Sequence, residues 1–212
     1  MLMRVFPLFI LLIGLAISWS LEQARQAAAI TTGAIVELHQ LPALKIGDWV
    51  FRQGTSVESE LIANIGQSRF SHIGVVTAIE PEVIITHATT NDDPNYSNQV
   101  INSRLIDFSS NQLARRIAIA RPQFLSTEQQ QRISQHITAK ISQPFVLSQR
   151  QHPHLYCTTL IADAITEQQP DFSLPWLNLE QAIFRGEYLH PQAFAERTDI
   201  EWLYPPTNSS TE

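Results

Sequence analysis

The feature that most constrains the fold of this chain is its single cysteine, Cys157. One cysteine cannot form an internal disulfide, and it cannot supply the several thiolates of a structural metal cage. The chain must therefore be held by a hydrophobic core. Its 212 residues, of which 44% are hydrophobic, are enough to build one ordinary domain. Cys157 itself is expected to be a free thiol, either buried or reactive.

The charge composition excludes one class of partner. The chain has 14 Lys and Arg against 20 Asp and Glu, a net charge of -6, and so lacks the basic surface that binds nucleic acid. Only 7 glycines are present, and none forms a glycine-rich phosphate-binding loop. We therefore predict no nucleic-acid partner and no metal or organic cofactor, and the sequence indicates no protein partner.

The N-terminus has the layout of an export signal. Arg4 is followed by residues 5–20, which contain no charged side chain, and Ser18 and Ser20 have the spacing that signal peptidase reads. We expect cleavage after Ser20. The alternative is that residues 1–20 remain as a membrane anchor, although a helix over 5–21 would span only about 25 Å of a core of roughly 30 Å. Either outcome predicts an exported protein of the periplasm or cell envelope.

Hydrophobic periodicity divides the remainder of the chain. Residues 21–42 are predicted to form an N-terminal helix or stalk, residues 43–204 the domain, and residues 205–212 a frayed tail. Within the domain we expect strands and helices in mixed order. The predicted strands cover 49–51, 71–79, 82–89, 99–103 and 114–120, and the predicted helices cover 57–65, a segment from Ser126 to Pro144, and 157–166.

Two histidines fall on the predicted hairpin 71–79 and 82–89. An even-numbered connection places Ala78 level with Val83 and His72 opposite Thr89. His87 is then a diagonal neighbour of His72 on the same face, within reach of a ring-to-ring hydrogen bond. Gly74 shares that face, and we expect its small size to let the helix that carries Cys157 approach closely.

A catalytic cysteine at neutral pH requires activation, because a thiol with a pKa of about 8.5 is only slightly ionised. A helix N-terminus contributes about 0.3–1 kcal/mol, and lowering the pKa by 2.5 requires about 3.4 kcal/mol. A neighbouring imidazole could supply the difference. The sequence therefore predicts that His72 takes the proton of Cys157 and that His87 holds the tautomer of His72.

Five short motifs occur in a telling order, with the histidines before the cysteine. The motifs are residues 47–52 (GDWVFR), 71–74 (SHIG), 87–88 (HA), 156–158 (YCT) and 191–194 (PQAF). On these motifs the domain resembles the YiiX/YebB-like cysteine hydrolases, which belong to the circularly permuted branch of the NlpC-type, papain-like amidases.

The resemblance implies an α+β, permuted papain-like fold, with an antiparallel sheet packed against helices and the nucleophile at a helix N-terminus. It implies that Cys157 is the nucleophile, His72 the base and His87 the third polar residue. Tyr156 matches the aromatic position before the cysteine, and its backbone or hydroxyl is a candidate for binding the oxyanion. His87 stands where close relatives often have Glu, so the third group is neutral here.

Two further departures from the family pattern leave this triad intact. Thr158-Thr159 replaces the usual Ser-Glu, and Phe145-Val146 replaces a common aromatic-Asp pair. Both bear on substrate preference.

Other polar residues have simpler interpretations. His152 and His154 lie in a Pro-containing loop with no second ligand pair, so we do not predict a zinc site with Cys157. Asp48 follows a glycine and is expected to cap a turn. Arg52 is a candidate for binding a substrate carboxylate, but we expect a solvated charge at a strand end.

These observations predict an exported thiol hydrolase with a Cys-His-His acyl-enzyme mechanism. The substrate implied by the resemblance is an amide bond in cell-wall peptide, or an acyl group of a lipid. Two alternatives remain open: a noncatalytic module that binds peptide or lipid on the same fold, and an acyltransferase or lipid amidase.

Overall fold

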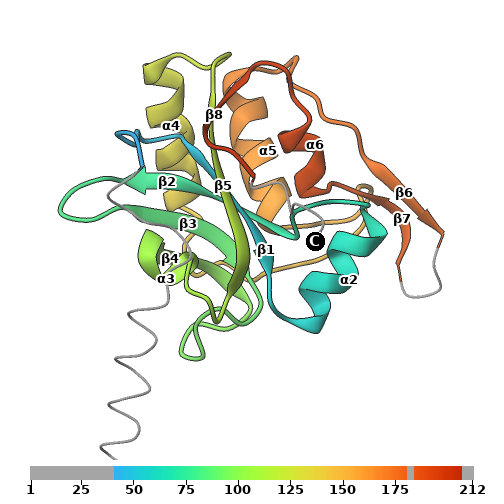
Figure 1. Cartoon of the computed structure of the whole chain (residues 1–212). Helices are drawn as coiled ribbons and strands as arrows, with labels where there is room; N and C mark the ends of the chain where they lie inside the picture. Colours follow the sequence, from blue (N-terminus) through green and yellow to red (C-terminus); the bar gives the residue numbers. More distant parts are fainter. Residues whose placement is uncertain (1–40, 181–183, 207–212) are drawn as a thin grey trace, which may run out of the picture.

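A six-stranded antiparallel sheet forms the centre of the computed structural model, which describes residues 41–180 and 184–206 (Figure 1). The strand order is β4-β3-β2-β1-β5-β8. This is the mixed α+β architecture with an antiparallel sheet that the sequence predicted. The strands are β1 (Trp49–Gly54), β2 (His72–Ala78), β3 (Ile84–Thr89), β4 (Gln99–Arg104), β5 (Ala114–Pro122) and β8 (Ile200–Tyr204).

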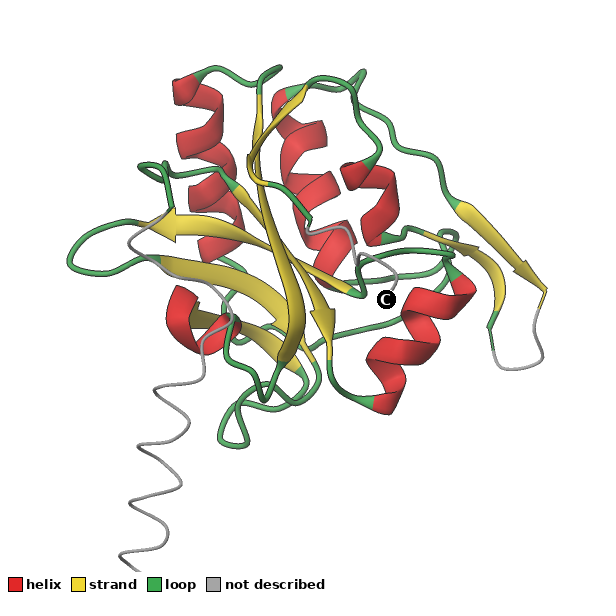
Figure 2. Ribbon diagram, viewed as in Figure 1, coloured by secondary structure: helices red, strands yellow, loops and turns green. Residues whose placement is uncertain are grey.

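Helices cover one face of this sheet and flank its ends. Helices α4 (Thr127–Thr138) and α5 (Cys157–Gln168) lie side by side and pack on β2 (Figure 2). The remaining described helices are α2 (Val57–Ile65), α3 (Leu105–Phe108) and α6 (Pro191–Ala195). A separate hairpin of β6 (Leu177–Glu180) and β7 (Arg185–Tyr188) projects from the body of the protein (Figure 1).

The start of α4 follows the sequence prediction and its end does not. Ser126 caps the helix, and its reciprocal hydrogen bonds with Gln129 form a capping box. The helix ends at Thr138 instead of continuing to Pro144. The backbone of Ser142, with a φ of 69°, donates to the carbonyl of Val100 at 2.9 Å. Because the Ser142 N–H bonds to strand β4, the segment after Thr138 does not continue as a helix to Pro144.

The β2–β3 hairpin has the predicted register over its regular part. Val75 pairs with Thr86 and Val76 with Ile85. The predicted pairing of Ala78 with Val83 is wrong, because an irregularity after Val76 shifts Ala78 onto Ile84. The irregularity lies at the connection and leaves the alignment of the other end of β2 unchanged.

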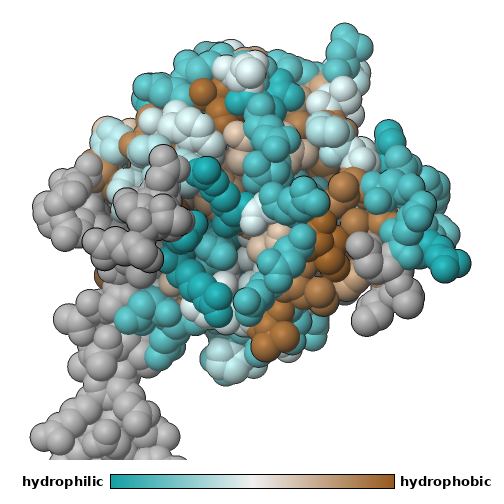
Figure 3. All heavy atoms as spheres, turned by 45° about the vertical axis from the view of Figure 1, so that its right-hand side comes forward, coloured by the Kyte–Doolittle hydropathy of each residue, from teal (hydrophilic) through white to brown (hydrophobic). Residues whose placement is uncertain are grey.

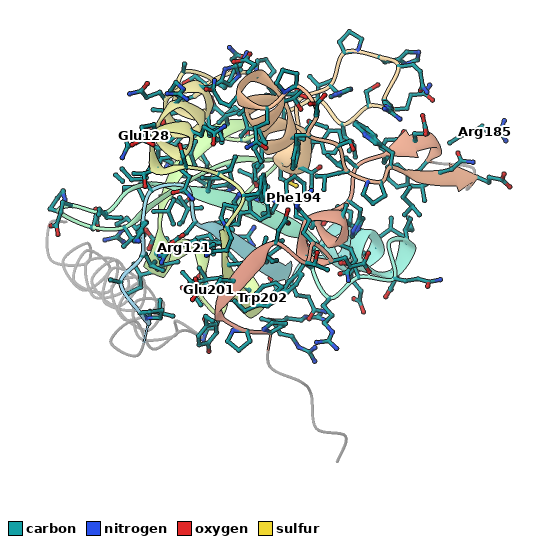
Figure 4. All side chains as sticks on the ribbon, turned by 90° about the horizontal axis from the view of Figure 1, so that it is seen from above. Arg121, Glu128, Arg185, Phe194, Glu201 and Trp202 are labelled. Atoms are coloured by element: carbon teal, nitrogen blue, oxygen red, sulfur yellow. The ribbon has the colours of Figure 1, made fainter. Side chains whose placement is uncertain are left out.

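Three strands escaped the sequence prediction: β6, β7 and β8. Strand β8 pairs with β5, about 80 residues earlier in the chain, with Ala120 opposite Trp202. Figure 4 shows Phe194 of α6 directed into the interior, where its ring lies 5.1 Å from that of Trp49, while Arg185 reaches outward at the tip of the β6–β7 hairpin. Such long-range pairings leave little trace in local sequence pattern.

The two faces of the sheet bury separate hydrophobic clusters. One face packs against α4, α5 and α6 and includes Ile73 and Val75 of β2. The opposite face packs against α3 and includes Val76 of β2 and Ile85 of β3. The alternation along β2 therefore places the neighbours Ile73 and Gly74 on opposite faces.

Helix α2 keeps part of its apolar side in solvent. Its bounds match the predicted 57–65, but Val57 and Leu61 are 80% and 43% exposed, and only Ala63 is fully buried. Figure 3 shows apolar surface on the side of the molecule that carries α2 and the β6–β7 hairpin. This surface lies beside the end of β1, because α2 begins three residues after that strand ends.

Several predictions fall outside the described residues. These are the signal peptide or anchor over 1–20, the helix or stalk over 21–40, and the tail from 207 to 212. Among the described helices, none is both long and apolar enough to cross a bilayer.

Candidate active site

The site is built around a hydrogen-bonded pair of histidines. His72 begins β2 and His87 lies in β3, and their Nε2 and Nδ1 atoms are 2.8 Å apart. The rings meet edge to face, with centroids 5.0 Å apart. His72 is 9% exposed and His87 is fully buried. The predicted diagonal contact between the two rings is thus present in the structure.

Ser103 extends this pair into a chain of three groups. Its Oγ lies 2.9 Å from Nε2 of His87, on the neighbouring strand β4. A hydroxyl can accept from an N–H, so His87 can donate to Ser103 and accept from Nε2 of His72. In that proton arrangement Nδ1 of His72 has a free lone pair and is ready to accept a proton. The sequence analysis missed Ser103, whose only signal was its place across from β3.

Gly74 makes room for His87, which corrects its predicted role. A Cβ at position 74 would lie 2.5 Å from Cγ2 of Ile85 and 3.2 Å from Cβ of His87. The space above Gly74 is therefore occupied by β3 side chains. Helix α5 packs instead against the other face of the sheet, with Ile73 and Val75.

Cys157 is the first residue of α5 and is 8% exposed. The backbone N–H groups of Ile73 and Thr158 act on its sulfur, so the thiol lies against the backbone of the residue that follows His72 in β2. Both candidate reactive groups are thereby brought to one end of the sheet. The sequence prediction of a nucleophile at a helix N-terminus agrees with this placement.

Burial reverses the expected ionisation of the site. It raises the pKa of Cys157 to about 11, against the lowering effects of the two backbone N–H groups and Arg52. Burial also lowers the pKa of His72 well below its usual value, and it lowers the pKa of His87 to about 4. The expected lowering of the Cys157 pKa is not found, because burial favours a thiol beside neutral imidazoles.

Tyr156 positions the helix that carries the cysteine. Its hydroxyl accepts from the backbone of Leu189 at 2.9 Å, and its own N–H donates to Oγ1 of Thr159 at 2.9 Å. The side chain is buried. The hydroxyl acts only as an acceptor in this contact and keeps its own proton as a donor, so the oxyanion role expected for Tyr156 stays a prediction.

A buried ion pair that the sequence analysis missed lies beside the histidines. Arg52 of β1 is only 4% exposed, which overturns the prediction of a solvated charge. Its Nη2 lies 2.7 Å from Oδ2 of Asp92, and that oxygen is 3.9 Å from Nδ1 of His87. The guanidinium also stacks on Phe108, 4.5 Å from the ring centre. Asp92 comes from a loop of turn-forming residues, which gave no sign of this contact.

A second buried ion pair lies at the other end of β1. Both oxygens of Asp48 accept from Arg121 at 2.7 Å, and Oδ2 also accepts from the backbone of Lys45 at 2.7 Å. Asp48 therefore caps a backbone turn, as predicted, and ties it to β5. Gly47 precedes it with a φ of 94°, a conformation suited to glycine.

One group of described side chains has the residue types of a metal site. Ligand atoms of His72, His87 and Asp92 all lie within 4.8 Å of one another. Their present contacts oppose a cation, however. The two imidazole nitrogens share a hydrogen bond, and Asp92 is already neutralised by the fixed charge of Arg52.

The loop histidines lie apart from this cluster. His152 is exposed, and its carbonyl accepts from Nδ1 of His154 at 2.8 Å. The ring of His154 packs 5.6 Å from that of Trp176 and borders a groove of about 470 Å³. Leu155 and Leu160, on either side of Cys157 in the chain, also line this groove.

Comparison with known proteins identifies the fold. No family model matches the sequence, and no curated protein matches it. A crystal structure described as the metalloprotein YiiX from Escherichia coli O157:H7, DUF1105, superposes with a TM-score of 0.60. The match covers 74% of this chain and 95% of YiiX at 16% sequence identity. This chain has the YiiX fold. The resemblance to YiiX predicted from the five motifs is thereby confirmed at the level of the fold.

Proposed function

We propose that this protein is an exported cysteine hydrolase, with a permuted papain-like arrangement of the YiiX fold, that cleaves an amide bond through an acyl-enzyme. The observation that carries the proposal is the 2.8 Å contact between His72 and His87, taken together with the backbone N–H of Ile73, the residue after His72, which acts on the sulfur of Cys157. A nucleophile, a base and a group that orients the base are the elements this chemistry requires.

In the proposed first step, Cys157 attacks the substrate carbonyl as its proton moves to Nδ1 of His72. The electron pair of the S–H bond forms the S–C bond, so no thiolate has to exist beforehand. This order of events follows from the neutral resting state, in which burial disfavours the thiolate and the imidazolium separately. Backbone N–H groups at the start of α5 hold the oxyanion.

In the following steps, His72 returns the proton to the leaving amine and the acyl group stays on sulfur. Water then enters and attacks the acyl carbon as His72 removes its proton; the S–C bond breaks, His72 returns the proton to the sulfur of Cys157, and the acid product leaves. His87 keeps Nε2 of His72 protonated throughout, because its Nδ1 accepts a hydrogen bond from that nitrogen. Its own Nε2–H donates a hydrogen bond to Ser103. The base is therefore always presented through Nδ1.

The groove bordered by His154 favours a peptide substrate. Its lining includes Lys140, Asp163 and the mutually paired His136 and Glu167, and none of Cys157, His72 and His87, so it supports a polar peptide as a surface near the site and not as the site itself. The proposed substrate is thus a peptide of the cell wall, encountered after export. A leaving amine in such a peptide would receive its proton from His72.

A lipid amide or ester is the second candidate substrate. The exposed apolar side chains Val57 and Leu61 of α2 favour it, because they lie beyond the end of β1. At that end the backbone of Gly54 donates to Ser71, the neighbour of His72, at 2.9 Å. An acyl chain could follow this surface, and the product would again form on Cys157.

YiiX is described as a metalloprotein, so the same property was considered for this chain. The candidate ligands are His72, His87 and Asp92, and they do not fit a resident cation as they stand. A metal would replace the proton between the two rings and would face the positive charge of Arg52. The proposed mechanism therefore uses no metal.

The test is digestion of cell-envelope fractions, followed by mass analysis of the released material. The wild type is expected to release product, and Cys157→Ala and His72→Ala are expected to release none. His152→Ala is the matched control, since it removes an exposed histidine outside the cluster and should keep full activity. Equal release by the wild type and Cys157→Ala would remove the catalytic proposal and favour a binding module.

Hydrolysis and acyl transfer are separated by a second measurement on the same digests. Adding a simple amine gives a transferred acyl product only if an amine can replace water at the acyl-enzyme. Release of the free acid alone supports hydrolysis.

A further inference from the structure

The carboxylate of Asp92 lies close enough to the two histidines to interact electrostatically with a positive charge on either ring. Its Oδ2 lies 3.9 Å from Nδ1 of His87, the atom that accepts from His72 in the arrangement described above. The Asp92 side chain is 12% exposed, so little water lies between these groups to weaken their interaction.

The hydrogen bonds of the ion pair between Arg52 and Asp92 are incomplete. Among the described residues, Nε of Arg52 and Oδ2 of Asp92 are buried without a hydrogen-bond partner, although Oδ2 is in ion-pair contact with Nη2. Arg52 donates from its other nitrogens, to Oδ1 of Asp92 at 2.9 Å and to the carbonyl of Phe108 at 3.2 Å. A pair serving stability alone is expected to satisfy its buried atoms. The unsatisfied Oδ2 is the oxygen nearest His87.

The charge on the histidines changes during the proposed reaction, while Arg52 and Asp92 both stay ionised. Burial opposes ionisation of Asp92, but Arg52 and the two histidines lower its pKa far below the usual value. Asp92 favours a protonated His72 and Arg52 opposes it. The charged and titratable groups that meet here are Arg52 from β1, His72 from β2, His87 from β3, Asp92 from the following loop and Cys157 from α5.

We propose that Asp92 is a positioning residue of the reaction: its carboxylate, held by Arg52 and lying 3.9 Å from Nδ1 of His87, stabilises the positive charge that His72 gains when the proton leaves Cys157. The S–H bond breaks and the N–H bond at Nδ1 of His72 forms, and Asp92 takes no proton. The neutral third group, His87, thereby acts together with a nearby negative charge. This inference rests on the proposed function.

The test measures the proton affinity of the histidine pair independently of catalysis. Histidine-labelled full-length protein is titrated by NMR, and envelope digestion is assayed in parallel. Asp92→Asn keeps the shape of the side chain and removes its charge. The midpoint of His72 and His87 protonation is expected to fall by at least about one pH unit, a tenfold loss of proton affinity, with a similar loss of release rate.

Three variants give the experiment its controls. Asp93→Asn removes a charge from the adjacent position of the same loop and should change neither readout. Asp92→Glu retains the charge and should restore most of the midpoint. Arg52→Gln should move the midpoint upward, so the inference stays testable even if Asp92→Asn fails to fold.

The outcomes distinguish this inference from the proposed function. If Cys157→Ala releases no product but Asp92→Asn leaves the midpoint and the rate unchanged, Asp92 is only structural and the inference fails. If Asp92→Asn and Asp93→Asn lower the rate equally, it fails as well. If Cys157→Ala releases as much as the wild type, the proposed function itself fails, whatever the titration gives.

Discussion

Strand β1 has a buried arginine–aspartate pair at each end, and the two pairs differ in how completely they are bonded. Near the first end, both oxygens of Asp48 accept hydrogen bonds, from Arg121 and from a backbone N–H. Toward the other end, the pair of Arg52 and Asp92 leaves two buried atoms without a hydrogen bond and stands beside two histidines. Burial and charge are alike in the two pairs, so the unsatisfied atoms and the titratable neighbours are what single out Arg52–Asp92 as the candidate for a functional role.

The largest expected effect is on folding stability, and it concerns the fully bonded pair of Asp48 and Arg121. Asp48→Ala should lower the free energy of unfolding by about 3–5 kcal/mol in urea denaturation, because it leaves Arg121 and the Lys45 N–H without their carboxylate. Asp107→Ala, which breaks an ion pair that is 50% exposed on both sides, should cost less than about 1 kcal/mol. A change in the His72 titration caused by Asp48→Ala in the folded protein would contradict the separation of the two ends.

The next largest effect concerns the end of β1 that lies beside the histidines, and it is the loss of folding stability in acid. The pKa of His87 falls from 6.5 to about 4 on folding, so the unfolded chain binds more protons than the folded chain between those values. Stability is therefore fully present above pH 6.5 and is lost as the pH falls to 4, by about 3 kcal/mol from this residue. Urea unfolding at pH 7 and pH 4 measures the loss.

Replacing the titrating group provides the control for this acid effect. His87→Gln should lose less stability than the wild type between the two pH values, since glutamine binds no proton there. An equal loss in both proteins would assign the acid sensitivity to other groups.

A smaller effect is expected from the far end of the hydrogen-bond chain. Ser103→Ala removes the partner of Nε2 of His87 and should cost about 1–3 kcal/mol, as for a buried donor left unsatisfied. It should also change the tautomer populations of His87, which nitrogen NMR shifts report. Ser109→Ala deletes another buried hydroxyl, bonded to the carbonyl of Leu105, and should leave those shifts unchanged.

The smallest expected effect concerns metal. Dialysis against EDTA should leave the release rate unchanged, because Arg52 already neutralises Asp92 and the histidines are bonded to each other. A loss of activity that one equivalent of zinc restores would contradict this account of the Arg52–Asp92 end. Metal analysis of the purified protein before dialysis supplies the control.

Local pattern predicted the parts of the fold that local interactions determine. The capping box of Ser126 and Gln129 marked the start of α4, and alternation in the hairpin placed His72 and His87 on one face. Both signals lie within a few residues or within one strand pair. The end of α4 was missed because a bond from Ser142 to β4 decides it.

The electrostatics of the site could not be predicted in the same way. Asp92 meets Arg52 across 40 residues, from a loop whose composition indicated only turns. Desolvation depends on everything packed around a group, so the rise in the pKa of Cys157 could not be obtained from its helix position alone. Sequence pointed to the candidate reacting side chains, and packing sets the direction of their pKa shifts.

The lone cysteine gives this protein a practical property. Every thioester that the chain can form lies on Cys157, so the mass of the intact protein reports a thioester at one known position. If hydrolysis of the proposed acyl-enzyme is slow, mass spectrometry of the intact protein could therefore detect the acyl group on Cys157 without proteolysis. The mass increase would identify that acyl group.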